Sequence, residues 1–336
     1  MSMEVHLNGY DLRELLTTAP KITDQLNGVC RTLDISVKKV EGLVNFLGQP
    51  IELWYRGARW FVGYVFKRGF KSDGSITYTA YDPLYYLKRN TDDWYFKNMT
   101  ATQAFKQVAD GSNVKILSLA NTGVVLPALH YQGSEADKVA VDLLARTYKA
   151  DNGKYWYRYQ PEANNDGLIL FERKVPTEIW AFQIGVNLTS ASLDESIEET
   201  ATVIKLINRE TGKVVVKMDT ETRNKYGQLV HFEEVDKDHA NTMEKTAQDL
   251  LDKLKKINVT MAAEGINPDG IIPQLYSADA IYIEEPQTGM IGGYYIRNVS
   301  HTFVNDSLIQ LSFDVIAAPE IPELQYSDAD KQEEKK

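Results

Sequence analysis

The sequence predicts an α+β, β-rich fold in which two β units of similar design flank a small α/β region. Three observations lead to this prediction. Residues 50–87 alternate apolar and polar side chains in three short runs separated by turns, and residues 280–315 repeat that arrangement. Between these stretches the apolar residues recur at every third or fourth position, which is typical of amphipathic helices.

The first β unit is predicted as an antiparallel meander whose strands are rich in Val, Ile, Tyr, Trp and Thr. These strands span residues 51–55, 60–66 and 76–82. Asp73-Gly74 supplies the positive φ that a tight hairpin turn requires, and Pro83 ends the last strand because it has no N–H to donate. Two further strands are predicted earlier in the chain, at residues 4–7 and 31–37. Residues 12–16 fit one helical turn or another strand equally well.

Two helices and a short sheet are predicted for the middle of the chain. Thr100 and Gln103 form a capping-box pattern that opens a helix ending near Gly111. A second helix is predicted to start at residues 134–137, with an apolar face that continues to Tyr148. Strands are predicted at residues 114–119, 154–159 and 168–172.

The β pattern resumes after Pro176. Strands are predicted at residues 201–207, 213–217, 229–233 and 258–262, and then in the second β unit at 280–284, 291–303 and 308–315. A capping-box pattern at residues 241–244 opens a helix that continues to Ile257. We interpret the apolar stripe of this helix as internal packing, with a groove for a partner as the alternative.

Each β unit carries a glycine early in its second long strand, at Gly63 and at Gly293. A glycine inside a strand often marks a bulge or a sharp bend, which the corners of a small β-barrel require. The shared design is compatible with an internal structural repeat. Chance similarity between two pairs of hairpins is the alternative.

These patterns divide the chain into four parts. They are a first β-barrel domain at 1–94, a middle α/β domain at 95–178, a second β-barrel domain at 179–320 with an inserted helix at 241–257, and a charged tail at 321–336. We expect the tail to be disordered, because from Asp328 onward it has almost no apolar side chains with which to pack.

The composition excludes several classes of function. The net charge is −10 and the isoelectric point is about 5.1, so a protein that grips nucleic-acid phosphates is not expected. No apolar run approaches the roughly 20 residues of a membrane helix, and the N-terminus does not resemble a signal peptide. The single cysteine, Cys30, is expected to be a small buried apolar residue.

No residue is predicted to be catalytic, to bind a cofactor or to hold a metal ion. None of the five histidines has another histidine or the cysteine at a metal-ligand spacing. They are His6, His130, His231, His239 and His301. Phosphate-loop and GxSxG patterns are also missing. Adjacent carboxylates on a strand point to opposite faces, so the pairs at 198–199, 233–234 and 284–285 are expected on a solvated surface.

The aromatic residues allow two interpretations. A cluster in the first β unit, with three more residues elsewhere, fits a barrel core or an interface, and a sugar-stacking platform is the alternative. Its members are Trp54, Tyr55, Trp60, Phe61 and Tyr64, with Trp94, Tyr95 and Trp156.

Several short motifs follow one another along residues 25–318. They are Arg31-Thr32-Leu33, Gly63, the run 76–87, Tyr95-Phe96 with Thr100-Ala101, the run 192–197, Val203-Ile204, Tyr226-Gly227 and the closing run 293–301. In their order and spacing the chain resembles the XkdQ/YqbQ proteins of Bacillus-type defective prophages. That family is similar to the central baseplate hub of contractile phage tails and tailocins.

The resemblance implies two related barrels, the first of them tube-like, around a middle α/β region. It also implies a homotrimer, whose six barrels would match a six-fold tail tube on one side and a three-fold spike on the other. The implied function is a structural baseplate hub, with no enzymatic activity. The chain would join the tail tube to the central spike of a contractile phage tail, prophage or tailocin.

The implied partners are the tail tube protein, the central spike protein and other baseplate proteins, with the tape-measure protein as a further candidate. DNA would pass through an acidic channel without specific binding, and no membrane insertion is expected. The protein would be in the bacterial host cytoplasm during assembly and then in the virion or tailocin particle. The alternative function is a cell-wall hydrolase or glycan-binding tail protein. A generic secreted β protein is disfavoured by the missing signal peptide.

Overall fold

The computed structural model describes residues 3–26, 28–40, 46–173, 179–236 and 241–317. The chain forms two compact units. The large unit comprises Met1–Ala191 and Ala262–Lys336, and the small unit is Ser192–Met261. The predicted tail at 321–336 lies outside the described residues. The fold is rich in β structure and contains helices, which confirms the α+β prediction.

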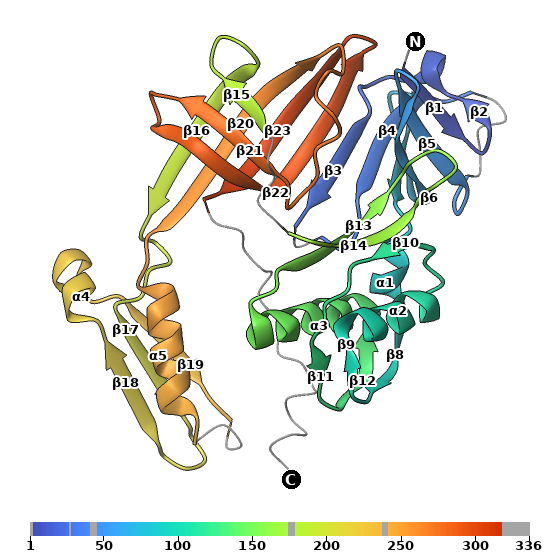
Figure 1. The fold of residues 1–336 in the computed structure, drawn as a ribbon. Helices are drawn as coiled ribbons and strands as arrows, with labels where there is room; N and C mark the ends of the chain where they lie inside the picture. The colour runs from blue at the N-terminus through green and yellow to red at the C-terminus, as the bar shows by residue number, and fades with distance from the viewer. Residues whose placement is uncertain (1–2, 27, 41–45, 174–178, 237–240, 318–336) are drawn as a thin grey trace. The chain divides into compact units, whose positions relative to one another are not determined.

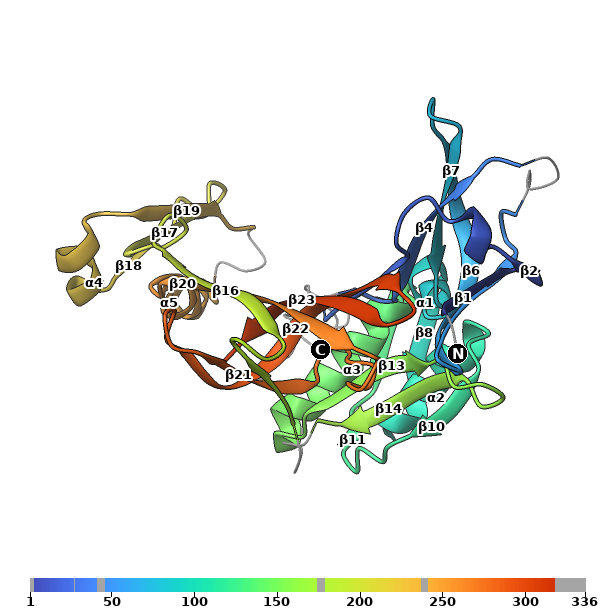
Figure 2. The same cartoon turned by 90° about the horizontal axis from the view of Figure 1, so that it is seen from above.

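The first β unit of the large unit contains seven strands and a short 3-10 helix. They are β1 (Met3–Leu7), β2 (Tyr10–Asp11), the 3-10 helix (Arg13–Leu15), β3 (Lys21–Gln25), β4 (Thr32–Lys38), β5 (Pro50–Tyr55), β6 (Ala58–Phe70) and β7 (Ser75–Tyr81). The meander β5-β6-β7 is antiparallel, as predicted. Its β6–β7 end extends beyond β5 and projects from the sheet (Figure 2).

The second β unit contains six strands. They are β15 (Trp180–Gln183), β16 (Leu188–Ser196), β20 (Asn258–Pro268), β21 (Ala280–Glu285), β22 (Met290–Asn305) and β23 (Leu308–Ile316). The meander β21-β22-β23 is again antiparallel. Strand β20 continues to Pro268, past the predicted end at residue 262.

The two β units share one strand order. In the first unit the order is β3-β4-β7-β6-β5-β1, and in the second it is β16-β20-β23-β22-β21-β15. Each of the six strands, counted along the chain, therefore takes the same place in its sheet. One difference is that β1 is antiparallel to β5, whereas β15 is parallel to β21. A common order of six strands favours a structural repeat over chance similarity.

The two β units are joined edge to edge. Strand β3 pairs with β4 on one side and with β22 on the other, so that one sheet continues through both units (Figure 1). None of the sheets in the described part of the chain closes into a barrel. The two barrels and the domain limits at 94/95, 178/179 and 320/321 therefore stay predictions.

The two matched glycines, Gly63 and Gly293, differ in how much space surrounds them. A Cβ at Gly63 would lie 2.2 Å from the carbonyl oxygen of Tyr81, so only glycine allows β6 and β7 to approach so closely. At Gly293 a Cβ would meet no atom within 4 Å. The bulges of β22 lie elsewhere, beside Arg297 and Val304. Strands β21 and β22 pair in unbroken register through Gly293, so the bulge is not found there, and a bend at Gly293 stays a prediction.

The middle of the chain forms a layer of helices and short sheets. Its elements are α1 (Tyr85–Arg89), β8 (Thr91–Phe96), β9 (Met99–Thr100), α2 (Ala101–Gly111), β10 (Ile116–Leu119), β11 (Val125–Leu126), β12 (Leu129–Glu135), α3 (Ala136–Asp151), β13 (Tyr155–Gln160) and β14 (Gly167–Glu172). The predicted capping box of α2 is confirmed, because the Thr100 hydroxyl accepts from Gln103 N and the Gln103 side chain accepts from Thr100 N. Helix α3 instead starts after Glu135, whose side chain does not cap it.

The small unit is a three-stranded sheet with a helix on one face. It contains β17 (Val203–Ile207), β18 (Val214–Met218), α4 (Thr220–Tyr226), β19 (Val230–Glu234) and α5 (Met243–Leu254). The apolar stripe of α5 packs on Ile204, Leu206 and Val215, which confirms the packing interpretation. Its N-cap is Thr242, one residue later than the predicted Asn241. None of the described helices is long and apolar enough to span a membrane.

Candidate functional surfaces and the buried joint

The histidines and Cys30 are dispersed over the structure. Within the described residues, no group of three His, Cys, Asp or Glu side chains is placed to hold a metal ion. His301 is buried in β22, and His6 lies in β1 beside Glu4. His239 falls outside the described residues. Cys30 is half-buried against the core of the middle layer, and burial raises the pKa of its thiol. The raised pKa favours the protonated thiol, which is a weaker nucleophile than the thiolate.

Of the three carboxylate pairs, two are exposed as predicted, and the third is not. Glu198–Glu199 and Glu233–Glu234 lie on the surface, whereas Glu285 is only 6% exposed. The Glu285 carboxylate accepts hydrogen bonds from the Thr288 hydroxyl and from the N–H groups of Gln287 and Thr288. These bonds hold the pKa of Glu285 below its usual value. Glu285 thus closes the β21–β22 turn, which the pattern of adjacent acids did not reveal.

The predicted aromatic cluster is mostly core. Five of its eight members are at most 9% exposed, namely Tyr55, Trp60, Phe61, Trp94 and Trp156. Trp54 and Tyr64 are half-buried, and Tyr95 is exposed. These rings do not form one platform on the surface, which favours the core interpretation over sugar stacking.

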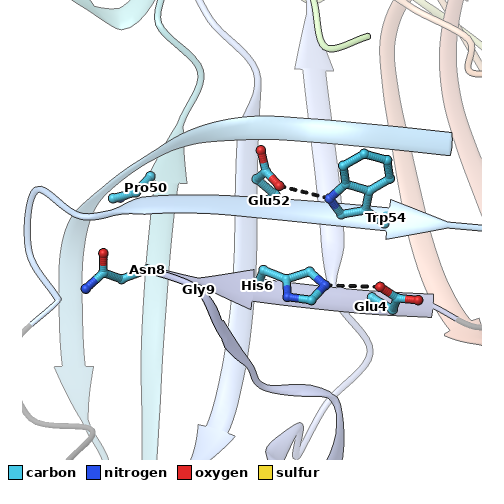
Figure 3. A pocket seen from close by; sticks show the side chains of 7 residues that line it. All are labelled: Glu4, His6, Asn8, Gly9, Pro50, Glu52 and Trp54. Atoms are coloured by element: carbon cyan, nitrogen blue, oxygen red, sulfur yellow. Dashed lines mark hydrogen bonds and ion pairs between the residues drawn. The ribbon is translucent and has the colours of Figure 1, made fainter. Parts of the chain in front are cut away.

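A shallow pocket of about 520 Å³ lies on the outer face of β1 and β5 (Figure 3). It is lined by Glu4, His6, Asn8, Gly9, Pro50, Glu52 and Trp54. His6 Nε2 lies 3.1 Å from Glu4 Oε2, and Trp54 Nε1 donates to Glu52 Oε2 at 2.9 Å. Arg59 forms an ion pair of 2.6 Å with Glu52. Both carboxylates of the pocket are therefore engaged by neighbouring side chains.

A buried aromatic cluster connects the two β units beside the β3–β22 pairing. Tyr55 and Trp60 come from the first unit, and His301 and Phe303 come from β22. The ring centroids of Trp60 lie 5.4 Å from those of both His301 and Phe303, and Tyr55 lies 5.5 Å from Phe303. We call this cluster, together with Arg31, the joint.

Arg31 brings a buried positive charge into the joint. It is 3% exposed, and its Nη1 donates to the carbonyl of Trp60 at 3.0 Å. Gln274 donates to the same carbonyl at 2.7 Å. The guanidinium of Arg31 also lies over the ring of Tyr276, 4.8 Å from its centroid. The loop before β21 is thereby fixed to the first β unit.

Two buried aspartates complete the connection. Asp24 accepts hydrogen bonds from the N–H and the hydroxyl of Ser277, at 2.9 and 3.1 Å. Asp82 accepts from the N–H groups of Arg31 and Leu84, at 3.0 and 2.9 Å. Burial raises the pKa of Asp82 to about 7 despite these donors and the nearby Arg31 charge. In the sequence, Arg31 and Asp82 stand out only as members of short motifs. No local pattern indicates that they are buried where the two β units meet.

The small unit has an exposed apolar face. Helix α5 covers one side of its sheet, and the opposite side carries large apolar residues that are 47% to 56% exposed. They are Val214, Val216 and Met218 of β18 and Val230 and Phe232 of β19. Contiguous apolar surface of this kind usually marks an interface with another macromolecule.

Comparison with known proteins identifies the family. A family model described as YQBQ-like matches residues 21–313. The chain belongs to the YQBQ-like family. Two Bacillus subtilis proteins are similar to it, each with 27% identity. The match to YqbQ covers 92% of this chain and 95% of YqbQ. The match to the phage-like element PBSX protein XkdQ covers 82% of this chain and 83% of XkdQ. The predicted resemblance to XkdQ/YqbQ is confirmed.

Solved structures of tail proteins share the fold of this YQBQ-like chain. The 43 kDa tail protein of prophage MuSo2 from Shewanella oneidensis matches with a TM-score of 0.65 at 16% identity, over 96% of this chain and all of that one. A tail protein from Neisseria meningitidis MC58 matches with a TM-score of 0.62 at 13% identity, over 96% of this chain and 98% of that one. The E. coli c3393 protein is a type VI secretion component described as similar to T4 tail proteins gp27 and gp5. It matches with a TM-score of 0.56 at 11% identity, over 97% of this chain and 77% of that one.

Proposed function

We propose that this YQBQ-like chain is a structural hub protein in the baseplate of a contractile phage tail, prophage or tailocin. Three copies would form a ring between the tail tube and the central spike, in contact with other baseplate proteins and, as a further candidate, the tape-measure protein. The protein would assemble in the bacterial host cytoplasm and remain in the particle. The name of the relative XkdQ and the shared fold of the tail proteins support this proposal.

The observation that carries the proposal is the repeated strand order. One chain contains two β units of the same order, connected edge to edge through β3 and β22. Three such chains supply six related β units, the number that a six-fold tube requires, while the chain itself keeps three-fold symmetry. In the ring each β unit would curl into a barrel-like segment. The domain limits predicted from the sequence would then separate the two segments from the middle layer.

The charge of the chain supports a channel through which DNA passes without being held. The net charge is −10, so a lumen lined by this protein would repel the phosphate backbone. We also propose that the protein is not an enzyme. Glu4, Glu52 and Glu285 are each engaged by neighbouring donors or cations and do not converge on one substrate position.

The experiment that tests the proposal is a mass measurement. Light scattering of the purified chain, alone and mixed with its tube and spike proteins, is expected to give three copies per complex. Assembly only in the presence of a partner would fit as well, because the partner could act as the template on which the ring forms. A chain that stays monomeric in every mixture, or that forms complexes with another copy number, would contradict the hub proposal.

The surface pocket with Trp54, Glu4 and Glu52 is the feature that favours the alternative of a cell-wall hydrolase or glycan-binding tail protein. Incubation with purified peptidoglycan is expected to release no soluble fragments, because both carboxylates are engaged. Binding of chitooligosaccharides that is lost in Trp54→Ala would support the glycan-binding alternative. The matched control is Tyr95→Ala, because Tyr95 is exposed but lies outside this pocket.

A further inference from the structure

The outer face of the small-unit sheet has one positive charge at its centre. Lys205 of β17 lies directly opposite Val216 of β18 and Phe232 of β19. Residues that lie opposite one another in a sheet point to the same side. The exposed ammonium group of Lys205 therefore has apolar side chains on both sides, and it forms no ion pair with any described residue. We call these residues the Lys205 face. Glu234, the acid on the same side of β19, is paired with Arg209.

The central lysine restricts what can cover this face. Packing of the same face from a second copy would place two Lys205 ammonium groups together, and like charges in an apolar contact are costly. Leaving Lys205 unpaired beneath any apolar partner would be costly for the same reason. The complementary surface therefore has apolar side chains on both sides of a carboxylate.

The chain carries such a surface in the segment 193–199, at the end of β16. Leu193 and Ile197 are 36% and 38% exposed, and Glu195 lies between them. Residues two apart in an extended strand point to the same side, so the carboxylate of Glu195 shares a side with Leu193. Glu195 is exposed and forms no ion pair among the described residues. Three further exposed acids, Asp194, Glu198 and Glu199, make the segment strongly negative.

We propose that the Lys205 face of one copy binds the segment 193–199 of a second copy, with Lys205 paired to Glu195. This inference rests on the proposed homotrimer and names one of its contacts. The two surfaces differ, so the contact is heterologous, and a heterologous contact closes into a ring of three when it turns each copy by a third of a revolution. The contact is not made within one chain, because the face and the segment are both exposed in the small unit.

The test is a charge exchange in the full-length protein. Lys205→Glu and Glu195→Lys are each expected to weaken self-association by about tenfold or more, because each brings like charges together in the contact. The double variant restores the opposite charges and is expected to recover most of the association. Lys245→Glu is the matched control, because it makes the same charge change on the exposed side of α5. Circular dichroism and the melting temperature check that each variant folds.

A second measurement locates the contact directly. Treatment of the double variant Lys205→Cys and Glu195→Cys with a short bismaleimide is expected to link copies covalently, because the cross-linker spans the gap that the Lys and Glu side chains filled, which a direct disulfide would not. Each single cysteine variant serves as the control, and it also accounts for any reaction of Cys30. Trimers that survive both charge reversals without cross-linking would overturn this contact and leave the hub proposal standing. A chain that never self-associates, with or without its tail partners, would overturn both.

Discussion

The buried His301 allows a sharp test of the joint. Its side chain is 1% exposed and packs edge-on against Trp60, and neither ring nitrogen has a hydrogen-bond partner among the described residues. Burial, together with the nearby charge of Arg31, lowers the pKa of His301 from 6.5 to about 3. We predict that His301→Leu, which keeps the side-chain volume similar and removes the titratable ring, changes how stability depends on pH.

The sign follows from linkage between proton binding and unfolding. The folded-state pKa of His301 is lowered, so its contribution to stability is present above pH 6.5 and is lost as the pH falls towards 3. Between pH 8 and pH 5 the unfolded chain binds a proton that the folded chain excludes. This difference lowers the free energy of unfolding by about 2 kcal/mol.

Asp82 works in the opposite direction. Its folded-state pKa is raised from 3.8 to about 7, so its contribution to stability is present below pH 3.8 and is lost as the pH rises through 7. Lowering the pH from 8 to 5 therefore raises the free energy of unfolding by about 2.5 kcal/mol. The two groups nearly offset each other in the wild-type protein. Removing His301 leaves the Asp82 effect uncompensated.

The assay is urea unfolding followed by tryptophan fluorescence. All five tryptophans lie in the large unit, so the signal follows the unit that contains the joint. When the pH falls from 8 to 5, the free energy of unfolding of His301→Leu is expected to rise by about 2 kcal/mol relative to that of the wild type. His6→Leu is the matched control, because it makes the same substitution at a side chain that is only partly buried and lies outside the joint. A stability difference for His301→Leu that stays constant with pH would refute the reasoning.

Three further predictions concern stability and use the same unfolding assay. Gly63→Ala is expected to lower the free energy of unfolding by about 3 kcal/mol, since its Cβ would clash with the Tyr81 carbonyl. Gly293→Ala is the control and should be tolerated, because a Cβ there meets no atom within 4 Å. Equal effects of the two variants would contradict this account of Gly63. Thr100→Ala removes the cap of α2 and should cost about 1 kcal/mol, and no loss of stability would mean that the capping bond contributes little. Asp24→Ala leaves the buried N–H and the hydroxyl of Ser277 without their acceptor, and it should lower the free energy of unfolding by about 1 to 3 kcal/mol. No loss of stability would mean that these two hydrogen bonds do not stabilise the connection between the β units.

The local patterns in the sequence predicted most strands of both meanders, because one face of each strand is buried and its side chains alternate accordingly. Strand β3 was missed. Its sequence, Lys-Ile-Thr-Asp-Gln at 21–25, is mostly polar, and it becomes a strand because β4 and β22 supply hydrogen bonds on both sides. Tertiary pairing of this kind leaves little trace in local composition.

The joint and the Lys205 face could not be read from the sequence for different reasons. Arg31 and His301 are 270 positions apart in the numbering of the chain, and only the fold brings both to Trp60. In β18 the run Val214-Val215-Val216 is apolar on both sides, so its pattern does not say which side α5 covers. Exposure of an apolar face depends on what packs there, and alternation alone does not supply that information.

In the proposed hub, the covalent connection of two β units within one chain would reduce the number of contacts that must form between chains. A ring of six segments made from single β units would pay the entropy of association at every contact. Here one contact of each pair lies within the chain, where β3 pairs with β22 and Arg31 and Asp24 fix the loop before β21. In the proposed ring, only the contacts between chains would then need affinity from exposed surfaces, and the Lys205 face is one apolar surface that could supply it. In the proposed ring, the buried joint would set the geometry within each copy, and the Lys205 face would bind the next copy.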